Sequence, residues 1–267
     1  MLSCGNNYDA VTAMNEIITY EQPLNEIIRV CLRLEQLFQQ IDHQLPDTSE
    51  LGTRNLITYI INILQLLDRP DLKAKLAKEL SHHLTNLMRY NQAPEIDAAK
   101  LSELTTQLDE LSRSLIDSSG KIGYRLRDTE ILNTLRMHLA SPGGGCSFDL
   151  PLFHFWLQQP AAARMETLTS WLSDFAQIRK SVELLLDLVR KNSKAETKTA
   201  VHGFHQELLD PQSNLRMLRI SVDRSLGVFP ENSVGRHFLS VRFFLPDIDK
   251  RPVQYGENLE FQLEYCN

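Results

Sequence analysis

The sequence predicts an α+β protein with a mostly helical N-terminal domain followed by a C-terminal antiparallel β-domain. Between residues 24 and 189, apolar side chains recur every three or four positions, which is the period of an amphipathic helix. From about Asn192 the period becomes two, as in half-buried strands. A strand-like segment at residues 17–21 (IITYE) stands alone before the helices. Because a single strand is unstable by itself, we expect it to complete the C-terminal sheet.

These changes of pattern divide the chain into three parts. Residues 1–15 are polar and without periodicity, so we expect a flexible extension, with Met14 as an alternative start. Residues 16–193 form the predicted helical domain, whose first strand joins the β-domain. Residues 194–267 form the β-domain, and its first segment, 194–198, is polar and is expected to be a linker.

Prolines, glycines and polar loops divide the helical domain into predicted helices. These cover about residues 24–41, 56–67, 72–87, 101–115, 125–139, 150–157 and 160–175, and the last of them continues through residues 178–191. The third and fourth are separated by a short turn at residues 91–94 and are expected to form an antiparallel hairpin. Asp149 is the expected N-cap of the helix that begins at Leu150 and Pro151.

The β-domain contains strands predicted at residues 215–222, 238–244 and 259–265, with a further strand at 199–206. Turns are expected at residues 210–211, 229–232 and 247–258. His202 and His205 are three apart in a predicted strand, so their side chains are expected to face opposite sides and cannot easily share a metal. The expected result is one four-stranded sheet that is extended by residues 17–21.

Composition limits the class of protein. The 267 residues are 42% hydrophobic and 23% charged, as in an ordinary globular protein, and the net charge of −6 is too acidic for a typical nucleic-acid binder. No run of about 18 apolar residues exists, so no membrane span is expected. The cysteines are scattered, which predicts reduced thiols in a cytosolic protein and no zinc site: Cys4, Cys31, Cys146 and Cys266.

Two patterns raise the question of catalysis or metal binding. The glycines at 143–145 lack the following lysine of a phosphate-binding loop. Cys146 could act as a nucleophile with His154 as its base, but no third group is evident to orient the base. We expect instead a glycine turn followed by a buried cysteine. Glu79 and His83 are spaced i and i+4, but the HExxH arrangement is absent, so a solvated polar face is expected.

Basic residues recur along the chain, among them Arg33, Arg69, Arg136, Arg236 and Arg242. One interpretation is a solvated surface with weak ion pairs, worth roughly 0–1 kcal/mol each. The other is that some of them line a groove for an acidic peptide, because arginine binds carboxylates through two parallel hydrogen bonds. Composition and spacing leave both interpretations open.

One segment identifies a family. Residues 141–157 (SPGGGCSFDLPLFHFWL) strongly resemble the signature of the ZapD (Z-ring-associated protein D) family. The resemblance extends to residues 20–37 (YEQPLNEIIRVCLRLEQL), 185–193 (LLDLVRKNS) and 259–266 (LEFQLEYC), and it covers about residues 17–266. The glycine-cysteine segment is specific to the family, whereas the leucine-rich helices are not.

The resemblance implies a function. Members of this family are dimeric, non-enzymatic, cytoplasmic proteins without a cofactor. They bind the C-terminal tail of the tubulin-like division GTPase FtsZ, cross-link and bundle its filaments, and support the Z-ring and septation at midcell. Their fold is a helical domain plus a β-domain, which agrees with the pattern of this sequence.

The resemblance also implies site residues. Arg33, Arg69, His154 and Arg242 match basic residues of the family that bind the FtsZ tail. Glu130 stands where a relative has an arginine, and it would oppose an acidic ligand locally. The arginine just before the strand is replaced by Arg236 or His237. With Arg136 included, the predicted tail-binding residues are Arg33, Arg69, Arg136, His154, Arg236 and Arg242.

Two alternatives from other classes are a cysteine-dependent enzyme that uses Cys146 and a nucleic-acid-binding adaptor. Loss of all function on Cys146→Ser favours the enzyme, and electrophoretic retardation of nucleic acid at physiological salt favours the adaptor.

Overall fold

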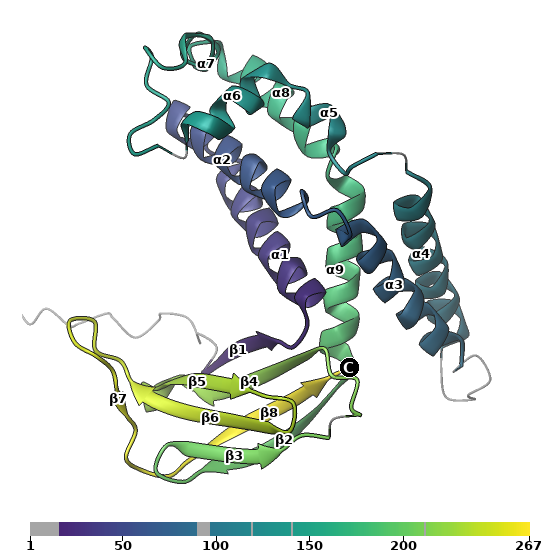
Figure 1. The fold of residues 1–267 in the computed structure, drawn as a ribbon, viewed down its shortest axis with the longest axis vertical. Coiled ribbons are helices and arrows are strands. Elements are labelled where there is room, and N and C mark those ends of the chain that lie inside the picture. The colour runs from purple at the N-terminus through teal and green to yellow at the C-terminus, as the bar shows by residue number, and fades with distance from the viewer. Residues whose placement is uncertain (1–15, 90–96, 119, 140, 211) are drawn as a thin grey trace, which may run out of the picture. The chain divides into compact units, whose positions relative to one another are not determined.

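The structure is a computed structural model that describes residues 16–89, 97–118, 120–139, 141–210 and 212–267. The predicted extension at 1–15 and the predicted turn at 91–94 lie outside the described residues. The predicted α+β class is confirmed (Figure 1). The chain divides into a helical unit, Glu26–Leu188, and a β-unit made of residues up to Asn25 together with Val189–Asn267. No described helix is both long and apolar enough to cross a bilayer.

The helical unit begins with four long helices whose apolar faces form its core. Leu34, Ile60 and Leu108 are at most 1% exposed, and each buried side chain of this kind contributes about 1.5–3 kcal/mol. The predicted hairpin forms, because α3 packs against α4 and the hydroxyls of Ser81 and Ser112 lie 2.9 Å apart. The helices are α1 Glu26–Gln44, α2 Glu50–Leu66, α3 Leu72–Met88, α4 Ala98–Asp117, α5 Tyr124–Arg127, α6 Glu130–His138, α7 Pro151–Leu157, α8 Ala161–Ser173 and α9 Ala176–Lys191.

The single helix predicted at residues 125–139 is wrong, because the structure contains two helices there. Thr129 has an extended backbone (φ −77°, ψ 114°), which separates α5 from α6. The side-chain amide of Asn133 donates to the carbonyl of Arg127, so this backbone acceptor at the end of α5 has a hydrogen-bond partner. Leu126 and Leu132, which are buried on the two sides of this break, are six positions apart, and this is not the spacing of residues on one helix face.

The β-unit is a sandwich of two antiparallel sheets, so the single sheet expected from the sequence is wrong. Sheet A has the strand order β1-β4-β8-β2, and sheet B has the order β3-β6-β5, with β7 pairing to β6. Alternate residues of both sheets form one core, in which the rings of Phe243 and Phe261 lie 5.0 Å apart. The strands are β1 Ile17–Pro23, β2 Ser193–Ala200, β3 Phe204–Leu208, β4 Met217–Asp223, β5 Phe229–Val234, β6 Phe238–Leu245, β7 Val253–Gln254 and β8 Leu259–Cys266.

Several details of the predicted β-domain are wrong. Residues 194–198 are not a linker but part of β2, which pairs with β8. Residues 229–232 are not a turn but the start of β5, where Pro230 is tolerated because β5 is at the edge of sheet B. His202 lies in a turn with φ 49° rather than in a strand. The polar residues that resemble loops belong to edge strands, which expose more of their length than central strands do.

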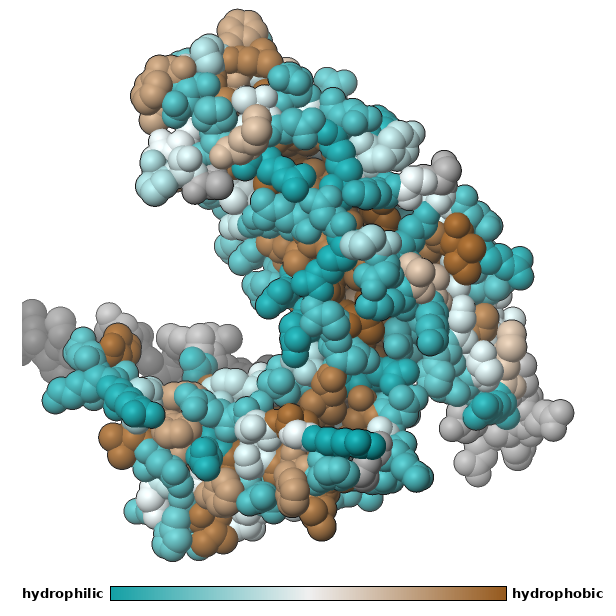
Figure 2. All heavy atoms as spheres, viewed as in Figure 1, coloured by the Kyte–Doolittle hydropathy of each residue, from teal (hydrophilic) through white to brown (hydrophobic). Residues whose placement is uncertain are grey.

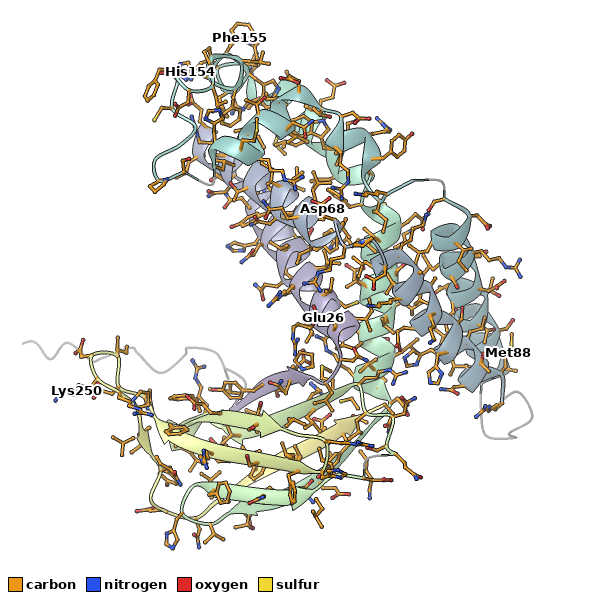
Figure 3. All side chains as sticks on the ribbon, in the orientation of Figure 1. Glu26, Asp68, Met88, His154, Phe155 and Lys250 are labelled. Atoms are coloured by element: carbon orange, nitrogen blue, oxygen red, sulfur yellow. The ribbon has the colours of Figure 1, made fainter. Side chains whose placement is uncertain are left out.

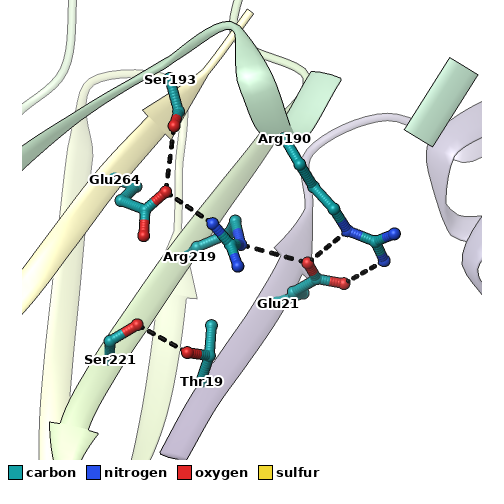
Figure 4. A network of polar contacts seen from close by, with 7 residues as sticks. All are labelled: Thr19, Glu21, Arg190, Ser193, Arg219, Ser221 and Glu264. Atoms are coloured by element: carbon teal, nitrogen blue, oxygen red, sulfur yellow. Dashed lines mark hydrogen bonds and ion pairs between the residues drawn. The ribbon is translucent and has the colours of Figure 1, made fainter. Parts of the chain in front are cut away.

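The N-terminal strand joins the C-terminal sheet as predicted, because β1 pairs with β4 along its whole length. Figure 4 shows the polar network that holds it. Glu21 accepts from Nε and Nη2 of Arg190, both at 2.8 Å, and from Nε of Arg219 at 3.2 Å. Arg219 also donates to Glu264 at 2.7 Å. Burial alone raises the pKa of Glu21, but the two arginines outweigh it and hold this pKa below its ordinary value of 4.5.

Candidate functional site

The first two predicted arginines belong to the α1–α2 pair, Arg33 within α1 and Arg69 just after α2. Arg33 is exposed on α1, and none of the described residues forms an ion pair or hydrogen bond with its side chain. Arg69 follows α2 and binds Glu26, which is labelled in Figure 3. Glu26 also accepts from Arg29 at 2.8 Å. The hydrogen bond from Arg69 is the largest cause that lowers the pKa of Glu26. Arg69 is therefore occupied by a carboxylate of its own chain.

Arg136 is occupied in the same way. Asp68, at the end of α2, binds both Arg127 and Arg136, the latter at 2.8 Å. Arg127 also donates to the carbonyl of Leu64 at 3.1 Å. The adjacent residues Asp68 and Arg69 thus connect α2 to α6 and to the first turn of α1. Two of the six predicted residues stabilise the helical unit in this structure.

The glycine segment forms a tight turn, as predicted. Gly143 and Gly145 have positive φ angles of 71° and 88°. A Cβ on Gly144 would lie 1.9 Å from the carbonyl oxygen of His138, so only glycine fits there. The buried Gly145 accepts a hydrogen bond from Nη1 of Arg54 at 3.2 Å. Arg54, which the sequence pattern does not single out, therefore holds the turn against α2.

Two predictions about this segment are wrong. Cys146 is exposed rather than buried, and its thiol donates to the carbonyl of Gly143 at 3.2 Å. Asp149 does not cap α7: the N-cap is Leu150, without a side-chain hydrogen bond, and Pro151 opens the helix. The amide hydrogens of Asp149 and Leu150 instead bond the carbonyl of Cys146, at 3.1 and 3.0 Å. A backbone turn at residues 146–150, rather than the carboxylate of Asp149, therefore precedes α7.

The helix after this turn presents His154 to solvent. Phe153 and Leu157 are buried, and the Trp156 ring stacks on Trp171 at 5.9 Å. The opposite side of α7 is exposed and carries His154 together with Phe155, which is 65% exposed (Figure 3). Phe148 and Leu152 are also exposed, so His154 stands among apolar side chains at this end of the helical unit, where Figure 2 shows brown spheres.

Glu130 lies in an acidic rather than a basic setting. It lines a pocket of about 190 Å³ between α6 and the start of α7, together with Thr134, Asp149 and Leu152. Two carboxylates in one small pocket disfavour an acidic ligand. Glu130, which stands where a relative has an arginine, thus has a second carboxylate, Asp149, beside it in this pocket. We therefore do not include the pocket in the predicted tail-binding site.

The remaining predicted residues belong to the β-unit. Arg236 is exposed in the turn between β5 and β6, and Arg242 is exposed in the middle of β6. The guanidinium carbon of Arg242 lies 5.4 Å from the centre of the Phe204 ring. Such stacking leaves the edge of the guanidinium free to bind a carboxylate. Among the described residues, neither arginine has an acidic partner.

Other candidate groups serve the fold. Burial raises the pKa of the Cys31 thiol to about 12 and that of Cys266 to about 11, so these two cysteines are the buried thiols that the sequence predicts. His83 is only 5% exposed, which corrects the solvated face expected for it. His205 contacts Glu207 at 3.1 Å. In the part of the chain that the structure describes, no group of three or more His, Cys, Asp or Glu side chains could hold a metal ion.

Comparison with known proteins identifies the class and then the family. The family model ZapD, described as a cell division protein, matches residues 32–242. Relatives named Cell division protein ZapD are similar along almost the whole chain. Identity is 36% in Methylococcus capsulatus (95% of this chain, 99% of the relative), 35% in Azoarcus sp. (94% and 99%) and 33% in Coxiella burnetii (93% and 97%). This chain is a cell division protein. It belongs to the ZapD family, as residues 141–157 predict.

Proposed function

We propose that this chain binds the C-terminal tail of FtsZ and, as a homodimer, cross-links and bundles FtsZ filaments at the midcell division site in the cytoplasm. Membership of the ZapD family supports the role in cell division. The partner and the assembly come from the family resemblance of the signature segment. No catalytic step is needed for this function, because cross-linking requires only two binding sites on one particle.

One observation carries the proposal. Arg33, His154, Arg236 and Arg242 are exposed, and among the described residues none of their side chains is paired with a carboxylate. An arginine that already holds an internal carboxylate must break that pair before it binds a ligand, whereas these four groups need not. They are the primary tail-binding candidates. Arg69 and Arg136 are secondary, because Glu26 and Asp68 occupy them.

The mechanism follows from symmetry and multiplicity. A two-fold dimer presents the same site twice, so one dimer can hold tails from two filaments. A filament displays many tails, so each bound tail raises the effective concentration of the next without any new contact. A weak single contact is therefore sufficient for bundling.

The decisive experiment is co-sedimentation with FtsZ, using full-length FtsZ and FtsZ without its C-terminal tail. We expect pelleting with the first and none with the second. Equal pelleting with both forms would refute tail binding. The variant Arg33→Glu/Arg242→Glu should lose pelleting. Its control is Lys100→Glu/Arg113→Glu, which changes the net charge equally at two exposed positions of α4.

The cysteine-dependent alternative is tested in the same assay. Cys146 is exposed, and its only described side-chain hydrogen bond is to the carbonyl of Gly143. Cys146→Ser preserves that bond with a hydroxyl donor, so we expect unchanged co-sedimentation. Complete loss of activity in this variant would instead support a role of the thiol in the function.

A further inference from the structure

The short helix α7 depends on its neighbours for its position. It has only seven residues, and an isolated helix of fewer than about 12 residues is marginal in water. Its N-cap, Leu150, makes no side-chain hydrogen bond to the first turn. Contacts from other elements therefore decide where α7 presents its exposed residues His154 and Phe155, which are labelled in Figure 3.

Two of these contacts come from one face of α2, because Glu50 and Arg54 are one helical turn apart. Nη1 of Arg54 donates to the carbonyl of Gly145 at 3.2 Å, and the guanidinium carbon lies 4.9 Å from the centre of the Phe153 ring. The carboxylate of Glu50 accepts from the side-chain amide of Gln158 at 3.0 Å. Arg54 thus holds the glycine turn and the middle of α7, and Glu50 holds the residue after the helix.

Of these two contacts, that of Arg54 is the harder to replace, because both of its partners are buried. Gly145 is buried, and Phe153 is only 2% exposed. A buried carbonyl that loses its donor pays the cost of its desolvation, whereas water can replace the exposed pair of Glu50 and Gln158. A planar guanidinium can stack on a ring with its face and donate with its edge at the same time. One side chain therefore couples the glycine turn to α7.

We propose that Arg54 is a positioning residue for tail binding, which acts through Gly145 and Phe153 to hold α7 so that His154 meets the FtsZ tail. This inference rests on the proposed function. Among the described residues, no carboxylate forms an ion pair with Arg54, so its charge serves the turn and the ring. A binding group has to be held within about 0.5 Å of its productive position by the residues that support it. A change at Arg54 therefore reaches His154 on the exposed side of α7.

The test is a double-mutant cycle, measured by fluorescence anisotropy with a labelled synthetic peptide of the FtsZ C-terminal tail and the full-length protein. Arg54→Met should weaken peptide binding about fivefold or more. In a protein that already carries His154→Ala, the same substitution should change the affinity by less than about twofold, because both substitutions remove one shared interaction. A direct contact between Arg54 and the tail would instead give the same loss in both proteins.

The matched control is Arg179→Met. The guanidinium carbon of Arg179 lies 5.4 Å from the centre of another phenylalanine ring of the helical unit, Phe38, but its ion pairs are with Asp42 and Glu183 rather than with α7. This variant should bind the peptide as the unchanged protein does.

A second variant, Arg54→Lys, keeps the charge but loses the planar fork. We expect it to bind as weakly as Arg54→Met. It also carries the cycle if Arg54→Met does not fold, which urea denaturation of each variant shows.

The outcomes separate the inference from the proposed function. If the unchanged protein does not bind the peptide, the proposed function fails, and the inference falls with it. If it binds and Arg54→Met binds equally well, the function stands and Arg54 is not a positioning residue. Equal losses with and without His154 also overturn the inference, as do full binding by Arg54→Lys and a matching loss in Arg179→Met.

Discussion

Arg164 is a buried arginine that holds three backbone carbonyls of the helical unit. It is 6% exposed, and it donates to the carbonyls of Thr48 (2.6 Å), Leu157 (2.8 Å) and Gln159 (2.5 Å). Its Nε also donates to the hydroxyl of Thr53 at 3.3 Å. One side chain therefore joins the start of α2 to the end of α7 and the start of α8. Only the planar guanidinium has enough fixed donors for these acceptors.

Replacing Arg164 should destabilise the protein. Arg164→Met leaves these acceptors without donors, and we expect a loss of about 3 kcal/mol in the free energy of unfolding, measured by urea denaturation with circular dichroism. Arg164→Lys should also destabilise, because an ammonium cannot span the same acceptors. Arg113→Ala is the control: its side chain is 71% exposed, and it should change stability by at most about 0.5 kcal/mol. A stability loss in Arg164→Met no larger than that of the control would contradict this role.

The neighbouring glycines 143 and 144 should differ in their tolerance of alanine. A Cβ at Gly144 meets the His138 carbonyl at 1.9 Å, whereas a Cβ at Gly143 meets nothing within 4 Å. Gly143→Ala should therefore cost only about 1–2 kcal/mol, for its positive φ of 71°. Gly144→Ala should cost more, because the end of α6 has to move. Thermal unfolding of the two variants measures the difference, and equal midpoints would show that the turn relaxes freely.

At the scale of elements, the ion pairs of Glu21 fix β1 to sheet A and to the last turn of α9. The pKa of Glu21 is lowered in the folded state, so its carboxylate stabilises the fold above the unfolded value of 4.5. This contribution is lost as the pH falls through the folded pKa, which lies below 4.5. The N-terminal strand β1 is therefore held to sheet A by ion pairs of Glu21 that are lost when this carboxylate is protonated.

Glu21→Gln should remove that pH dependence. At pH 7 the variant should be less stable by about 1–2 kcal/mol, because an amide cannot replace the bidentate pair with Arg190. Below pH 4.5 its stability should approach that of the unchanged protein. The measurement is the free energy of unfolding in urea between pH 3 and 7. Glu260→Gln, exposed on the outer face of β8, is the control and should keep the acid response.

At the scale of the whole molecule, bundling depends on screened charges. Because the Debye length falls from about 10 Å at 0.1 M salt to about 3 Å at 1 M, light scattering by FtsZ bundles should decrease steadily with added salt. In Arg33→Gln/Arg242→Gln the signal should be weaker at low salt and less sensitive to salt. Salt-independent bundling by the unchanged protein would contradict the electrostatic part of the proposed function.

Periodicity was informative where an element buries one continuous face. The strands β4, β6 and β8 were predictable because their inward residues alternate strictly, and the long helices were predictable from their apolar stripes. Two edge strands, β2 and β5, were not predicted, because they bury too little of their length to produce the pattern. The break before α6 was not predicted either, although the six positions between the buried Leu126 and Leu132 do not match the spacing of one helix face.

The sequence by itself determined the α+β class, the origin of the completing strand and, through residues 141–157, the family. These properties depend on local pattern and on residue identity, which the chain carries directly. Only the tertiary structure decided which arginines are already paired with carboxylates of the same chain, because an ion pair such as Asp68–Arg136 joins residues that are far apart in the sequence. It also decided that Arg54 joins the glycine turn to α7, because these segments meet only once the helices have packed.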